Sequence, residues 1–109
     1  MGGKPKNNCY AVIYTQKFLP CVEPDAQMLN RLVEEVKKQP GYIDHVSFRD
    51  AEGRSLTVSY WDSPESIAAW RQHPLHVRVR EYAVQNWLEE YSVKTCSVEY
   101  ENMFKKSGE

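Results

Sequence analysis

The fold is decided by residues 42–65, which read YIDHVSFRDAEGRSLTVSYWDSPE. Two segments rich in β-branched and aromatic residues, 42–49 and 55–61, flank a short Gly-containing connection, and this pattern is typical of a β-hairpin. Ser63 and Pro64 then predict the start of a helix, because Ser caps free backbone amides and Pro fits the first helical position. A hairpin that leads directly into a helix is therefore the centre of the predicted fold.

Before this hairpin, the sequence predicts one strand and one helix. Residues 9–18 alternate between two sets of apolar and β-branched side chains, which indicates a strand. A helix is expected to start at Pro24 or Asp25 and to end at residues 39–41, Gln-Pro-Gly. Its apolar residues have helical spacing: Met28, Leu29, Leu32, Val33 and Val36.

After the hairpin, the sequence predicts a helix broken at His73-Pro74, a second helical stretch over residues 75–89, and a last strand over 91–101. The second stretch is expected to place these residues near one face: Leu75, Val79, Tyr82, Ala83, Asn86 and Trp87. The resulting order is βαββαβ. We therefore expect an α+β, ferredoxin-like fold, with a four-stranded antiparallel sheet and the helices on one of its faces.

The two faces of the predicted sheet differ in character. Leu56, Val58 and Tyr60 alternate with small polar residues in the third strand, and Val46 and Phe48 do so in the second. We expect this apolar face to be covered by helices or to line a pocket. The first strand is apolar on both faces, so it needs cover on both. Since the helices cover one face only, a symmetric homodimer packed sheet on sheet is expected.

Bulk properties favour one soluble domain, expected over residues 9–104, with flexible tails at 1–8 and 105–109. The 109 residues carry a net charge of -1 and no basic stripe, which argues against nucleic-acid binding. No apolar run is long enough to cross a membrane. The three cysteines lack Cys-x-x-Cys spacing, so reduced thiols in a cytoplasmic protein are expected rather than a zinc site.

Several side chains could carry chemistry, and each also has an ordinary structural interpretation. Trp70 faces inward beside the Pro74 break, where a cleft could open, but periodicity alone favours plain core packing for it. His73 and His76 could serve as proton acceptors or ligands, or could be surface residues and helix caps. Tyr14, Gln16 and Tyr82 could place polar groups in the same cleft or simply pack. No phosphate-binding loop or catalytic triad pattern is present, so no cofactor is expected.

Residues 59–76, SYWDSPESIAAWRQHPLH, resemble the antibiotic biosynthesis monooxygenase family. The resemblance rests on Trp-Asp-Ser at the strand end, on Ala-Ala-Trp-Arg in the helix, and on the His-Pro-x-His that follows. Residues 39–42, Trp87 and Tyr91 also fit, so the similarity extends over about residues 9–104.

This resemblance implies a dimeric α+β barrel with a pocket between helices and sheet in each protomer. One branch of the family oxidises polycyclic phenols or quinols without flavin or metal, and another binds and degrades haem. Trp70 matches the Trp that lines this pocket in both branches. Active members use an Asn near the end of strand one, where this chain has Gln16.

We therefore expect a cofactor-independent monooxygenase that acts on a small aromatic phenol or quinol. His76, His73 and Gln16 are the candidate catalytic residues; Trp70, Tyr14, Tyr82 and Trp61 are the candidate substrate-binding residues. A non-catalytic dimeric module for a small ligand is the main alternative, and haem binding is a lesser one.

Overall fold

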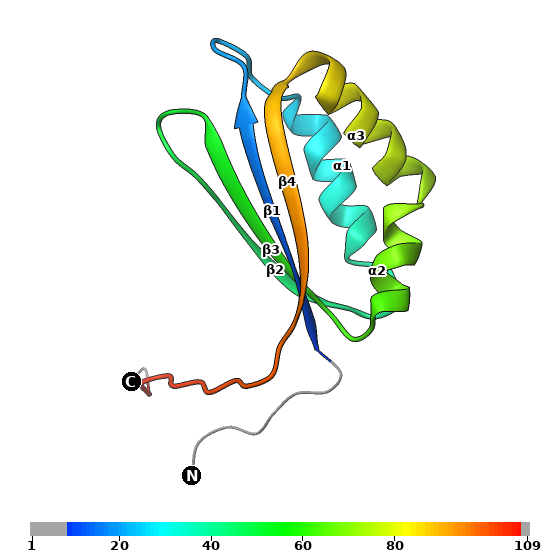
Figure 1. Cartoon of the computed structure of the whole chain (residues 1–109), viewed down its shortest axis with the longest axis vertical. Helices are drawn as coiled ribbons and strands as arrows, with labels where there is room; N and C mark the ends of the chain where they lie inside the picture. The colour runs from blue at the N-terminus through cyan, green and yellow to red at the C-terminus, as the bar shows by residue number, and fades with distance from the viewer. Residues whose placement is uncertain (1–8, 108–109) are drawn as a thin grey trace.

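The computed structural model describes residues 9–107 and confirms the ferredoxin-like α+β fold. The elements in chain order are β1 Tyr10–Phe18, α1 Ala26–Val36, β2 Tyr42–Arg49, β3 Arg54–Trp61, α2 Pro64–Arg71, α3 Pro74–Asn86 and β4 Leu88–Ser97. The four strands form one antiparallel sheet in the order β2-β3-β1-β4. Figure 1 shows the three helices on one side of this sheet and the other side uncovered.

Each helix begins at the residue type that its first turn requires. The Asp25 carboxylate accepts hydrogen bonds from the amides of Gln27 and Met28, which caps α1. Ser63 caps α2 as predicted, with Pro64 in the first turn. The predicted break at His73-Pro74 separates α2 from α3, because Pro74 can start a new helix but cannot continue the old one.

Within residues 9–107, the expected helix cover over the apolar face of the hairpin is absent, although Phe48 and Leu56 do line a hollow. Val46 pairs with Val58, and Phe48 pairs with Leu56, so the four side chains share one face. That face points away from the helices: Phe48 is 66 % exposed and Val46 is 44 % exposed. The small polar face of β3 lies beneath the helices instead, because the space there is a cavity and not a packed core.

Two further expectations need correction. The last strand is Leu88–Ser97 and not 91–101, because Leu88 pairs with Phe18 across an irregularity in the ladder and is buried there. Tyr82 and Asn86 lie on the exposed side of α3, whereas Val79, Ala83 and Trp87 are buried. The expected tails at 1–8 and 108–109 lie outside the described residues, while 105–107 are exposed and without regular structure.

Buried aromatic side chains lie at both ends of β1. Phe18, Ala83, Trp87 and Leu88 form one cluster at the end of this strand. Trp61 is 1 % exposed and pairs with Tyr10 at the opposite end. The space between the two ends, below the helices, is therefore available for a ligand.

Gly41→Ala is expected to destabilise the protein more than Gly53→Ala does. Both glycines have positive φ, 86° and 85°, which costs a residue with a Cβ about 1–2 kcal/mol. At Gly41 a Cβ would also lie 2.6 Å from the Cβ of Ser66, whereas at Gly53 the nearest atom is 3.9 Å away. The extra overlap adds about 1–3 kcal/mol. Urea unfolding of both variants measures the difference, and equal losses of stability would contradict it.

Candidate functional site

A cavity of about 610 Å³ lies between the sheet and the helices. Its volume is within the usual range for small-molecule sites. Both layers contribute apolar and aromatic side chains; the sheet adds small hydroxyl groups, and α2 and α3 add arginines and a histidine. The residues that matter below are Tyr14 and Gln16 from β1, Ser55 and Trp61 from β3, Trp70 and Arg71 from α2, and His76 and Arg80 from α3.

One side of this cavity carries a chain of hydrogen bonds from β3 to β1. The Ser55 hydroxyl donates to Gln16 Oε1 at 3.0 Å, and Gln16 Nε2 donates to the Tyr14 hydroxyl oxygen at 3.1 Å. Burial raises the pKa of Tyr14, so this phenol is neutral at pH 7. Because the Tyr14 oxygen already accepts a proton from Gln16, its own O–H remains available to donate to a ligand.

Trp70 lies between two imidazoles where α2 gives way to α3. The Trp70 ring centre is 5.1 Å from that of His73 and 5.2 Å from that of His76. His76 lines the cavity. Burial, followed by the positive charge of Arg80, lowers its pKa below the ordinary value of 6.5. His76 is therefore a neutral imidazole at pH 7 and can accept a proton there.

His73 has a structural role in the fold. Its Nδ1 accepts a hydrogen bond from the amide of Leu75 at 3.1 Å and so caps α3. Its Nε2 lies 3.6 Å from a carboxylate oxygen of Glu35 on α1. Both ring nitrogens of His73 therefore have partners, and His73 is not among the residues that line the cavity.

The structure brings five of the seven candidate residues to one cavity: Tyr14, Gln16, Trp61, Trp70 and His76. Trp61 is buried, with Nε1 donating to Ser59 at 3.0 Å and its ring in an edge-to-face contact with Tyr42. Tyr82 does not line the cavity. It is 45 % exposed and packs against Trp87, with ring centres 5.5 Å apart.

Sequence reasoning missed the arginines of the cavity. Arg71 and Arg80 both line it, as does Arg49 of β2, whose guanidinium lies 4.8 Å from the ring centre of Phe18. The spacing could have revealed Arg80, because it follows His76 by four residues, and residues four apart share one helix face. Arg80 lies close enough to help lower the pKa of His76, and its charge opposes the rise that burial causes in the pKa of Tyr14.

Arg80→Gln is expected to raise the pKa of His76. The substitution removes a positive charge that disfavours the imidazolium form, while the burial of the ring remains. The imidazole proton shifts of His76, followed by NMR from pH 4.5 to 8.5, measure the change. Arg78 is exposed and does not line the cavity, so Arg78→Gln is the matched control. An unchanged His76 titration in Arg80→Gln would contradict the expectation.

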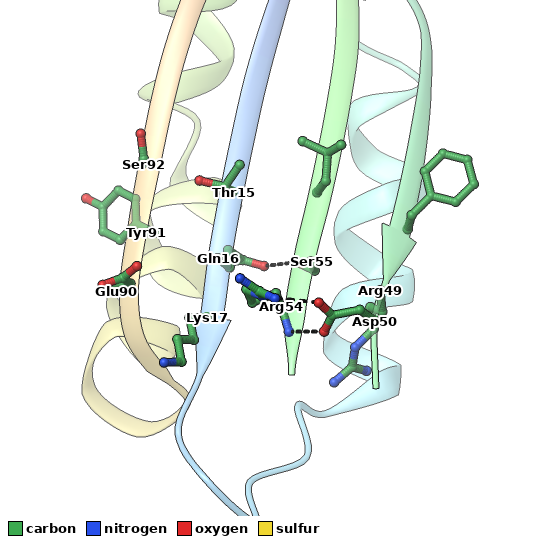
Figure 2. A pocket seen from close by; sticks show the side chains of 12 residues that line it. Thr15, Gln16, Lys17, Arg49, Asp50, Arg54, Ser55, Glu90, Tyr91 and Ser92 are labelled. Atoms are coloured by element: carbon green, nitrogen blue, oxygen red, sulfur yellow. Dashed lines mark hydrogen bonds and ion pairs between the residues drawn. The ribbon is translucent and has the colours of Figure 1, made fainter. Parts of the chain in front are cut away.

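A second hollow of about 440 Å³ lies at one end of the sheet and is shown in Figure 2. Its charges compensate one another: Arg54 Nε is 3.1 Å from Asp50 Oδ2, and its Nη2 is 3.5 Å from Glu52. Hydrogen bonds, first from the backbone amide of Arg54, hold the pKa of Asp50 below its usual value. Lys17, Arg49 and Glu90 also line this hollow, so it carries charges of both signs.

Residues 9–107 contain neither a cluster of metal ligands nor a membrane-spanning helix. Within that range, no cluster of three or more His, Cys, Asp or Glu side chains could hold a metal ion. The three cysteines, Cys9, Cys21 and Cys96, are free thiols. None of the described helices is long and apolar enough to span a bilayer.

A single ferredoxin-like sheet with three helices on one face and a cavity between them defines a small α+β domain. The family model for antibiotic biosynthesis monooxygenases matches residues 26–82, which is more than half of the chain. The uncharacterized protein YqjZ of Bacillus subtilis (strain 168) is 33% identical over 103 residues, 94% of this chain and 90% of that protein. The chain therefore belongs to the antibiotic biosynthesis monooxygenase family.

Solved structures share the fold at much lower identity. A Shewanella oneidensis protein aligns with a TM-score of 0.78 at 11% identity, over 91% of this chain and 99% of that chain. SnoaB, a cofactor-independent oxygenase from Streptomyces nogalater, aligns with a TM-score of 0.65 at 11% identity, over 80% of this chain and 91% of that one. These likenesses concern the fold alone.

Proposed function

We propose that this protein is a monooxygenase that needs no cofactor and acts on a small aromatic phenol or quinol. The observation that carries the proposal is the meeting of Trp70, His76 and Tyr14 in one cavity. Trp70 offers a flat surface for an aromatic ring, His76 a neutral imidazole, and Tyr14 a hydroxyl donor. Family membership supports oxygen chemistry, and SnoaB shows that a protein of this fold can be a cofactor-independent oxygenase.

The reaction needs only a base and a shielded site. His76 removes the phenol proton, and the phenolate transfers one electron to O₂. The two radicals then combine at a ring carbon that still bears hydrogen, and the His76 imidazolium returns its proton to the peroxide. Loss of water from that carbon leaves a carbonyl, so phenol and O₂ give a quinone and H₂O. The cavity excludes bulk water from these intermediates.

Oxygen uptake with 1-naphthol tests the proposal, with 1,4-naphthoquinone as the expected product. Trp70→Phe is expected to raise KM about 3- to 10-fold, because the smaller ring buries less of the substrate. Tyr82→Phe is the control, since Tyr82 is exposed and outside the cavity. Absence of uptake across a panel of fused-ring phenols, or equal KM values for the two variants, would contradict the proposal.

Gln16 supports a second candidate, a non-catalytic module that binds a small ligand. Its amide already donates to Tyr14 and accepts from Ser55, so only the second N–H of Nε2 remains to hold a substrate oxygen. A phenol that raises the melting temperature without oxygen uptake would favour this role.

We also propose a homodimer formed through the uncovered face of the sheet. Val46, Phe48 and Leu56 are exposed there, and apolar area of this kind marks an interface. The chain beyond β4 leaves the body on the same side, away from the helices, and carries the exposed Met103 and Phe104 (Figure 1). A cytoplasmic location is proposed from the three free thiols, which an oxidising compartment would disfavour.

A further inference from the structure

Among the residues that the structure describes, arginines line the cavity and carboxylates do not. The chain as a whole has 15 acidic and 14 basic residues. The described lining nevertheless contains Arg49, Arg71 and Arg80, together with two histidines, and it contains neither Asp nor Glu. The net charge of the chain therefore does not explain this asymmetry.

Arg80 is the arginine best placed to meet a ligand. It is half-buried on α3, one turn after His76, which corresponds to about 6 Å along the helix axis. Its charge acts on both His76 and Tyr14, so it lies near the two groups that would contact a phenol. Within residues 9–107, no ion pair joins Arg71 or Arg80 to a carboxylate.

A partly buried guanidinium without a carboxylate partner favours an anionic ligand. Arginine presents a planar fork of donors that matches both oxygens of a carboxylate. A ligand carboxylate would regain the charge pairing that the described residues do not provide. A cationic ligand would meet only like charges, and a neutral one would leave Arg80 unpaired.

We infer that the cavity binds an aromatic acid, with its ring against Trp70 and its carboxylate paired with Arg80, while Arg71 adds positive charge. This inference rests on the proposed function in one respect, namely that the phenol hydroxyl lies at His76. Because His76 and Arg80 stand one helical turn apart, the hydroxyl and the carboxylate of the ligand are expected at separate positions of its ring system. Arg80 is thus a specificity-determining residue for the substrate.

Two matched compounds test the inference: 6-hydroxy-2-naphthoate and its neutral primary amide, which have nearly the same shape. Their binding to the full-length protein is measured by calorimetry under argon, so that no turnover occurs. The carboxylate is expected to bind at least about tenfold more tightly than the amide, because a charge-assisted pair replaces a neutral contact.

Three variants assign this preference to one residue. Arg80→Gln is expected to abolish most of it, and Arg80→Lys to retain part, because Lys keeps the charge but not the fork. Arg78→Gln removes the same charge from an exposed position of the same helix and is expected to keep the full preference. Melting temperatures of the three variants, with no ligand present, establish that each is folded.

The outcomes separate this inference from the proposed function. Equal binding of acid and amide, no binding of either compound, or an undiminished preference in folded Arg80→Gln would overturn the inference. A clear carboxylate preference without oxygen uptake by any phenolic acid would overturn the monooxygenase proposal and leave the aromatic-acid site standing.

Discussion

His76→Gln is expected to lower the rate of oxygen uptake at pH 7.5 by about 10²–10⁴-fold, the usual contribution of a general base. Gln has a similar polarity and length but cannot accept the phenol proton. The cavity and the stacking surface of Trp70 remain, so substrate binding is expected to change little. Initial rates and KM, measured together with a phenol as substrate, separate the two effects.

The pH profile of oxygen uptake by the unsubstituted protein adds a second readout for His76. Its lowered pKa means that the neutral imidazole predominates at pH 7, so activity is expected to fall only as the pH drops below about 6.5. This acidic limb is expected to disappear in His76→Gln. By the same linkage, the unfolded chain takes up a proton on His76 more readily, so stability also decreases as pH falls through this range. His73→Gln with the same loss of rate as His76→Gln would contradict the assignment.

Phe48→Asp is expected to convert the proposed dimer into monomers at micromolar concentration. Full burial of a Phe side chain contributes about 1.5–3 kcal/mol, and a symmetric interface contains the residue twice. A carboxylate in its place would also have to lose its hydration. The dimer dissociation constant is therefore expected to rise at least about 100-fold, as measured by analytical ultracentrifugation.

Val84→Asp is the matched control for this change. Val84 is an apolar residue that is 48 % exposed, so it resembles the proposed interface residues in exposure. It lies on α3, however, and not on the open face of the sheet. Its substitution is expected to leave the dimer intact. Leu56→Lys, on the same face as Phe48, is expected to act like Phe48→Asp. A native protein that sediments as a monomer at micromolar concentration would overturn the proposed interface.

The cavity residues show how far sequence patterns reach. Trp70, His76, Tyr14, Gln16 and Trp61 were predicted as site residues and do line one cavity. Tyr82 and His73 were predicted for the same reasons, but the structure places the first in solvent and uses the second as a helix cap. Helical periodicity does not resolve whether a residue at the edge of a face, such as Tyr82, points inward or outward. The capping role of His73 becomes visible only when the structure shows the Leu75 amide at its ring nitrogen.

The sequence alone determined the order of strands and helices, because alternating strands, the Ser63-Pro64 start and the Pro74 break are local signals of backbone geometry. Which face of the hairpin the helices cover was decided only in the tertiary structure. Alternation of apolar and polar residues separates the two faces of a strand but does not say which face the helices cover. Here the apolar face of the hairpin is exposed, because the helices enclose a cavity with the sheet and do not pack on it as a core. The uniform positive charge of that cavity likewise arises only when Arg49, Arg71 and Arg80 from three separate elements meet.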